Sequence, residues 1–222
     1  MFVCWSAKGG SGTTVVAASL ALVLSRSRPT VLVDLAGDVP AALGLAEPTG
    51  PGIRDWLSSA AADAASLERL AVDAGDGLSI VHGGSDVTVA PARWSHLVEV
   101  LVATRWSVVI DAGLGPTPTP LHRDGSLLVT RPCFLSIRRA TSIGGAPSAV
   151  VLVDEPGRAL SRDDIERAVG APVVARVPWD PAVARAVDAG LLRSRLPRSI
   201  AHPLATIARS PNVDVGVNLE PR

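Results

Sequence analysis

The sequence predicts an α/β fold of three layers, in which helices cover both faces of a doubly wound, mostly parallel sheet. Short, uniformly apolar runs alternate along the chain with segments of helical periodicity. Strands that are apolar on both sides belong to sheets covered on both faces, and helices usually connect parallel strands. A length of 222 residues and a hydrophobic content of 47% suit one such domain with a full core.

The apolar runs predict seven strands, and the periodic segments predict the helices between them. The strands are expected at residues 2–6, 30–34, 78–82, 107–111, 126–130, 149–153 and 173–177. Helices are expected at residues 14–25, 92–104 and 162–169, with a closing helix at 204–209. We assign residues 1–209 to a single domain and expect 210–222, which lack periodicity, to form a flexible C-terminal tail.

Composition excludes several classes of protein. The formal net charge is zero, so no global field attracts nucleic acid or anionic lipid. The two cysteines, Cys4 and Cys133, are too few for a disulfide framework or a cysteine-rich metal site. No apolar run reaches about 18 residues and no basic segment opens the chain, so we expect neither membrane insertion nor a signal peptide. We therefore expect a cytoplasmic protein.

Lys8 is the only lysine of the chain, and it opens a glycine-rich segment that follows the first strand. The other basic residues are arginines, which indicates that a compact, flexible ammonium is needed here. Gly9, Gly10 and Gly12 permit positive-φ turns that aim backbone N–H groups inward, and the helix that follows adds its positive N-terminus. Together with Ser11 and Thr13, these residues predict a cradle for phosphate.

Three residues complete the predicted nucleotide site. Thr14 is placed to put its hydroxyl on a bound Mg²⁺, as in phosphate loops of the P-loop type. Asp34 and Asp111 end two buried strands, and the carboxyl ends of parallel strands are where such folds bind ligands. We expect Thr14, Asp34 and Asp111 to hold the metal. An ordinary glycine-rich turn between a strand and a helix is the alternative.

The segment from Lys8 to Thr14, KGGSGTT, resembles the deviant Walker A loop of the ParA/MinD ATPases. The strands ending at Asp34 and Asp111 resemble the next strand and the Walker B strand of that family. Pro178, Trp179 and Asp180 resemble its segment near the adenine. The similarity covers about residues 2–208 and is greatest to the pilus-localising and septum-site members called TadZ or CpaE. It implies a P-loop NTPase fold and binding of ATP or ADP with Mg²⁺.

The resemblance also implies roles for single residues. Lys8 matches the signature lysine, which reaches across a nucleotide-dependent homodimer to the partner's phosphates, and Lys8 and Asp34 match catalytic positions. A solvated surface lysine is the alternative for Lys8. Residues 113–120 match a switch region, although three prolines make a rigid connector equally consistent.

Two departures from the family pattern bear on hydrolysis. Thr13 stands where the family has the lysine that holds the β- and γ-phosphates, and Ala36 stands where it has the acid that orients water. Asp38 lies two residues further along. Losing one charge-assisted contact costs about 1.5–3 kcal/mol, or roughly ten- to 150-fold in affinity. We therefore expect weakened binding and slow or absent turnover.

Three functions follow from these observations. The first is a nucleotide-binding positioning or partitioning protein that dimerises with ATP, has degraded hydrolysis and recruits a partner of a pilus, septum or partitioning system. The second is an active ATPase switch in chromosome or plasmid partitioning or in septum or pilus placement. The third is a ligase similar to dethiobiotin synthetase. Arg193, Arg195 and Arg198 could also bind DNA non-specifically or form a solvated surface.

Overall fold

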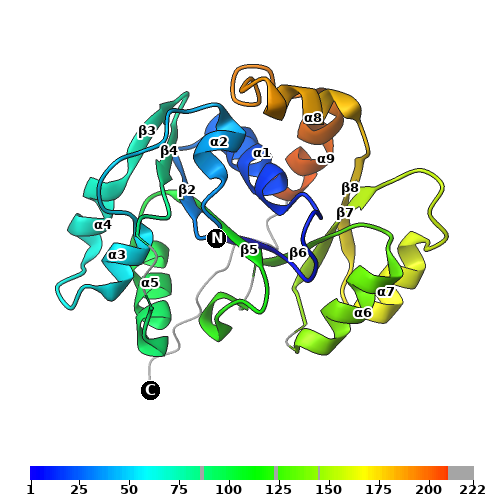
Figure 1. Ribbon diagram of the computed structural model, residues 1–222, viewed down its shortest axis with the longest axis horizontal. Helices are drawn as coiled ribbons and strands as arrows, with labels where there is room; N and C mark the ends of the chain where they lie inside the picture. Colours follow the sequence, from blue (N-terminus) through cyan, green and yellow to red (C-terminus); the bar gives the residue numbers. More distant parts are fainter. Residues whose placement is uncertain (86–87, 123–124, 145, 210–222) are drawn as a thin grey trace.

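The computed structural model describes residues 1–85, 88–122, 125–144 and 146–209. Within them an eight-stranded sheet runs through the centre, and helices cover both of its faces (Figure 1). The order of the strands is β3-β4-β2-β5-β1-β6-β7-β8. This arrangement confirms the predicted three-layer, doubly wound α/β fold. The predicted tail, 210–222, lies outside the described residues.

The seven predicted strands are all present and run parallel to one another. They are β1 (Phe2–Ser6), β2 (Thr30–Asp34), β4 (Leu78–Val81), β5 (Ser107–Leu114), β6 (Ser126–Thr130), β7 (Ala149–Asp154) and β8 (Val173–Pro178). An additional strand, β3 (Val72–Gly75), pairs antiparallel with β4 at the edge of the sheet. It was not predicted, because two of its four residues are exposed and it forms no apolar run.

The helices divide into two layers. One face of the sheet is covered by α1 (Thr13–Ser25), α2 (Val39–Leu43), α8 (Pro181–Asp188) and α9 (Arg198–Arg209). The other face is covered by α3 (Ile53–Ser58), α4 (Ala64–Leu70), α5 (Pro91–Ala103), α6 (Phe134–Ile143) and α7 (Arg162–Val169). A short 3₁₀ helix, η1 (Thr119–His122), follows β5. None of the described helices is both long and apolar enough to cross a bilayer.

Helix α1 is the centre of the larger core. Leu20 and Leu24 of α1 are fully buried against Leu32 of β2, and Leu204 of α9 belongs to the same cluster. Burying side chains of this size contributes about 1.5–3 kcal/mol each. Helix α9 starts at Arg198, earlier than the predicted closing helix, because Ile200 extends its buried stripe. This packing fixes the N-terminus of α1 at the carboxyl edge of the sheet.

The register of the sheet brings the two predicted acids together. Asp34 and Asp111 are direct partners in the pairing of β2 with β5. Asp111 is also the partner of Cys4 in β1, but the next pair is Trp5 with Gly113, so the strand bulges between these pairs. A bulge bends a strand and turns the neighbouring side chains. The carboxyl ends of β1, β2 and β5 therefore form one functional edge.

Candidate functional site

The loop between β1 and α1 has the backbone of a phosphate-binding turn. Gly10 and Gly12 have φ angles of 77° and 91°, a region that side-chain-bearing residues rarely adopt. Gly9 does not, which corrects the expectation that all three glycines take positive φ. A Cβ at any of the three positions would meet no atom within 4 Å. The glycines at 10 and 12 are therefore needed for the turn itself and not for space inside the protein.

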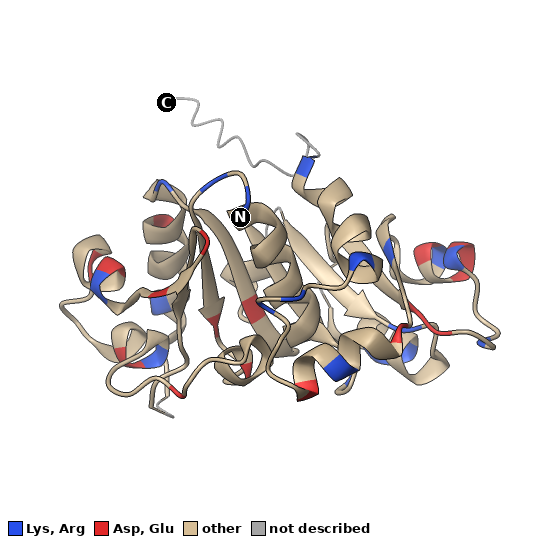
Figure 2. Ribbon diagram, turned by 90° about the horizontal axis from the view of Figure 1, so that it is seen from above, with Lys and Arg blue, Asp and Glu red and all other residues tan. Residues whose placement is uncertain are grey.

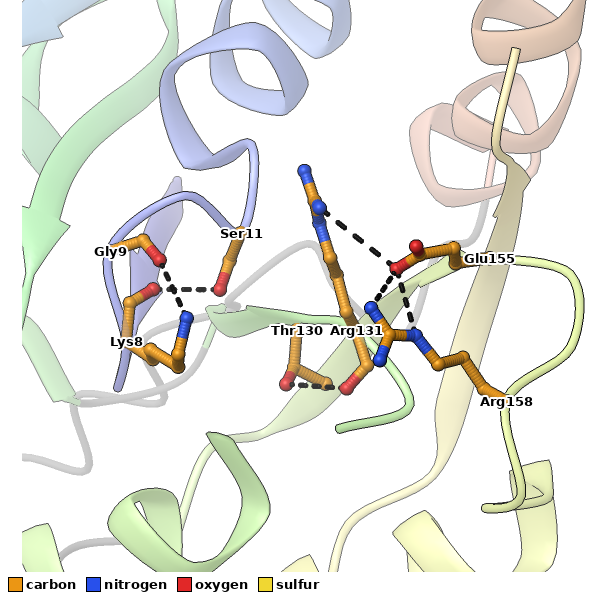
Figure 3. A network of polar contacts seen from close by, with 7 residues as sticks. All are labelled: Lys8, Gly9, Ser11, Thr130, Arg131, Glu155 and Arg158. Carbon is orange, nitrogen blue, oxygen red and sulfur yellow. Dashed lines mark hydrogen bonds and ion pairs between the residues drawn. The ribbon is translucent and has the colours of Figure 1, made fainter. Parts of the chain in front are cut away.

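Lys8 folds back onto this loop. Its Nζ donates to the carbonyl oxygen of Gly9 at 3.4 Å, and Ser11 Oγ donates to the carbonyl oxygen of Lys8 at 2.7 Å (Figure 3). The side chain is half-buried, and within the described part of the chain no acidic side chain pairs with it. The ammonium is thus held at the rim of the loop without a carboxylate to neutralise it.

The first turn of α1 is suited to an anion. The N-cap residue, Gly12, offers no side-chain acceptor, and the first turn contains no acid. The first backbone N–H groups and the helix dipole therefore remain available to a negatively charged ligand. Thr13 is buried, with 7% of its surface exposed, and Thr14 is half-buried.

A cavity of 530 Å³ opens at this loop. Both Thr13 and Thr14 lie in its wall, together with Gly9, Gly10, Ser11 and Gly12. Opposite them lie Ala36 and Asp38, from the segment that follows β2, and Gly113 and Leu114 at the end of β5. Asp38 is exposed and makes no side-chain capping bond to α2, so its carboxylate is available to this cavity. Ala36 has no such group.

Asp34 fixes the segment that carries these residues. Its Oδ1 accepts from the backbone N–H groups of Ala36 (3.0 Å) and Gly37 (2.6 Å), and its Oδ2 accepts from that of Val39 (3.0 Å). Burial raises the pKa of this carboxyl, and the three N–H donors lower it. The structure thus uses both oxygens of Asp34 to hold the turn that positions Ala36 and Asp38.

Asp111 has a free carboxylate oxygen. Its side chain is fully buried, Oδ1 accepts from the N–H of Gly113 at 3.1 Å, and Oδ2 has no hydrogen-bond partner. Burial raises the pKa of Asp111 to about 6, the Thr14 hydroxyl and the Gly113 N–H oppose that shift, and the charges of Asp34 and Asp38 add to it. An unpaired, buried carboxylate oxygen is costly unless a ligand satisfies it.

A magnesium ion fits this position. In the described ranges, no three His, Cys, Asp or Glu side chains gather into a metal cluster. Mg²⁺ needs no such cluster, because it usually binds one or two carboxylates and takes its other ligands from phosphate and water. The free oxygen of Asp111 beside Thr14 provides one carboxylate of this kind.

A second cavity, of 270 Å³, adjoins the first and shares Ser11, Gly12 and Val15 with it. Its wall is mostly apolar and comes from α1, β8, α8 and α9. The predicted residues Pro178, Trp179 and Asp180 all lie in this wall. Asp180 caps α8 by accepting from the N–H of Ala182 at 2.8 Å, and it also accepts from Ser199 Oγ at 2.6 Å. The two cavities together provide a polar compartment and an apolar one, side by side.

Arg131 is the residue of this site that the sequence analysis did not single out. It follows β6 and lies in the wall of the apolar cavity, with its guanidinium carbon 4.5 Å from the centre of the Trp179 ring. Figure 3 shows it between the glycine loop and the pair formed by Glu155 and Arg158. A charged residue directly after the strand next to β1 was the available signal in the sequence.

Comparison with solved structures places the fold among known ones. No family model and no curated protein matches the sequence. Among solved structures, the chain is similar to a ParA family ATPase from Chlorobium tepidum, with a TM-score of 0.73, 23% identity, and coverage of 93% of this chain and 97% of the other. The MinC:MinD cell division protein complex of Aquifex aeolicus gives a TM-score of 0.74, 21% identity and 94% coverage of both chains. The septum site-determining protein MinD of Pyrococcus horikoshii, in complex with Mg-ADP, gives a TM-score of 0.73 and 20% identity, with coverage of 93% of this chain and 94% of the other. The chain therefore has the P-loop NTPase fold of the ParA/MinD ATPases.

Proposed function

We propose that this chain binds a nucleoside di- or triphosphate with Mg²⁺ and acts as a nucleotide-dependent homodimer in a positioning or partitioning system. The observation that carries the proposal is the buried oxygen of Asp111 that has no hydrogen-bond partner. It lies beside Thr14, at the N-terminus of α1, which has no side-chain cap. A bound cation would satisfy this oxygen, and phosphate would satisfy the N–H groups at the start of α1. ATP and ADP are the ligands that the resemblance implies, and the MinD of Pyrococcus horikoshii was solved with Mg-ADP.

Each predicted site residue has a role in this proposal. The N–H groups from Gly9 to Thr13 hold the phosphates, and Thr14 and Asp111 hold Mg²⁺. Asp34, which was expected to be a third ligand of the metal, instead positions the segment over them, because both of its oxygens accept hydrogen bonds from backbone N–H groups. Trp179 and its neighbours Pro178 and Asp180 form the wall for the base. A bound Mg²⁺ would neutralise phosphate charge, as it does in phosphoryl-transfer sites.

Hydrolysis is proposed to be slow or absent. Thr13 lies where its short side chain brings no charge to the phosphate cavity, and Ala36 cannot orient water. An active ATPase switch is the second candidate, and one observation favours it. Asp38 lines the same cavity as Ala36 and has a carboxylate that does not cap α2.

The homodimer is proposed from the surface around the loop. Three large apolar side chains are exposed at the carboxyl edge of the sheet, namely Leu114 (58%), Phe134 (68%) and Leu135 (53%). Lys8 lies at the same edge and has no acidic partner among the described residues. Apolar groups beside an unpaired cation suit contact with a second copy that carries bound phosphate.

The protein partner is proposed to belong to a pilus, septum or partitioning system in the cytoplasm, as the similarity to TadZ and CpaE implies. Non-specific DNA binding has little support in the fold. Arg193 donates to the carbonyl oxygen of Ala74 at 2.8 Å, so it is not free for phosphate. Figure 2 shows basic and acidic residues interspersed along the ribbon of the described residues.

One titration with a hydrolysis assay tests the function. We expect Mg-ATP and Mg-ADP to bind weakly, with affinities roughly ten- to 150-fold below those of a loop that has its lysine, and to show little turnover. Asp111→Ala should abolish the Mg²⁺-dependent part of binding. Turnover that Asp111→Ala and Asp38→Ala both remove would establish the active switch, with Asp38 in the place of Ala36. Absence of any nucleotide binding would contradict both candidates.

A further substitution tests the role of Lys8 in assembly. Lys8→Ala should weaken nucleotide-dependent dimerisation more than it weakens binding to the monomer, because the ammonium is proposed to act on the second copy. Lys8→Arg should rescue poorly, since a planar guanidinium does not replace a compact ammonium in a tight turn. Sedimentation with and without a non-hydrolysable ATP analogue and Mg²⁺ measures this. A wild type that stays monomeric at saturating nucleotide would rule out the dimer.

A further inference from the structure

The apolar cavity beside the phosphate loop contains a guanidinium with unused donors. Arg131 Nε is buried and has no hydrogen-bond partner. The polar neighbour of its guanidinium among the described residues is Glu155, whose Oε2 lies 4.0 Å from Nη1, beyond hydrogen-bond distance. Nη2 of Arg158 lies closer to the same Glu155 oxygen, at 2.6 Å, and pairs with it. A buried N–H without an acceptor is costly, so this position is suited to a ligand that brings acceptors.

Trp179 holds the guanidinium of Arg131 at the wall of the cavity. The guanidinium lies over the indole ring at 4.5 Å, an arrangement favoured by cation–π attraction. A guanidinium held against a ring by this attraction still has its N–H groups to donate to a ligand. Arginine presents them as a rigid fork that can donate two parallel hydrogen bonds. The cavity thus offers a planar pair of donors next to an apolar wall.

The other polar side chains of this wall are mainly acceptors. Besides Ser11, they are the carboxylates of Asp180 and Asp188. Amide side chains, which read adenine by accepting from its amino group and donating to N7, are absent from the described residues. The sequence has no glutamine, and its two asparagines, Asn212 and Asn218, lie beyond them.

We propose that Arg131 makes this pocket selective for guanine over adenine nucleotides, an inference that rests on the proposed function. Guanine has two adjacent acceptors, O6 and N7, which match the arginine fork. Adenine places its amino donor beside N7, so one N–H of the fork would face another donor. The opposite edge of guanine carries N–H donors, which suit the carboxylate of Asp188.

Titration of the wild type with Mg-GDP, Mg-ADP and inorganic pyrophosphate tests the proposal. We expect GDP to bind about 5- to 150-fold more tightly than ADP, the range for one good bidentate contact. ADP binding as tight as GDP binding would overturn the inference and leave the proposed function intact. No binding of pyrophosphate or of either nucleotide would overturn both. The wild-type comparison does not depend on whether any variant folds.

Two matched variants assign the preference to Arg131. Arg131→Gln should remove or reverse the preference for guanine, because an amide can donate to N7 of adenine and accept from its amino group. Arg131→Met keeps a long side chain against Trp179 without donors, and it should lower GDP affinity towards that for ADP. If both variants weaken GDP, ADP and pyrophosphate by the same factor, Arg131 acts on the phosphates through its charge and the inference is wrong.

Discussion

Replacing Thr13 by lysine is expected to tighten binding of Mg-nucleoside triphosphate about ten- to 150-fold, the value of one charge-assisted contact. Thr13 lies in the wall of the phosphate cavity at the first position of α1, and the backbone cradle is already formed by Gly10 and Gly12. A longer side chain at this position has 530 Å³ of cavity to enter. The new ammonium should therefore reach the β- and γ-phosphates without rebuilding the loop.

Isothermal titration calorimetry of the wild type, Thr13→Lys and Thr13→Met would measure the effect. Methionine has a side chain of similar length without a charge, so Thr13→Met separates the effect of the ammonium charge from the effect of filling the cavity. We expect Thr13→Met to bind no better than the wild type. Equal affinities for Thr13→Lys and the wild type would show that the loop does not present its N–H groups to phosphate.

A second large effect concerns the pH dependence of stability. Asp111 has a folded-state pKa of about 6, raised from an ordinary value of 3.8 mainly by burial. The folded chain therefore keeps this proton between about pH 4 and 6, where the unfolded chain has lost it, and stability falls as pH rises through that window. Above about pH 6 the free energy of unfolding is therefore roughly 2–3 kcal/mol lower than it is below pH 4.

Asp111→Asn should remove this part of the slope. Urea unfolding at pH 5 and pH 7.5 would compare the variant with the wild type and with Asp163→Asn, which changes an exposed carboxylate on α7. We expect the wild type and Asp163→Asn to lose stability over this interval relative to Asp111→Asn. Mg²⁺ with nucleotide should restore stability at pH 7.5 to the wild type and much less to Asp111→Asn. Parallel pH dependences for all three proteins would refute the raised pKa.

Much of the fold could be predicted because the sheet is covered on both faces. Most of the parallel strands leave a largely apolar run, as in β1, where all five residues are buried. Shorter elements left weaker signals. Helix α2 has only five residues and β3 only four, and their positions depend on packing against α1 and on pairing with β4.

The candidate site was predictable as a set of residues, but not in its contacts. The sequence alone determined which residues gather at the edge, because parallel strands place Lys8, Asp34 and Asp111 at one end of the sheet. Only the tertiary structure decided that both oxygens of Asp34 accept hydrogen bonds from backbone N–H groups, while one oxygen of Asp111 has no hydrogen-bond partner.

Arg131 shows the same limit most plainly. It lies 48 positions before Trp179 in the sequence, and no local pattern links the two. The pairing of β6 with β7 and of β7 with β8 brings their strand ends to one edge, and the guanidinium then stacks on the indole. Periodicity and spacing report which residues face the core or end a strand. Which side chain uses which partner is decided by distances that exist only once the chain has folded.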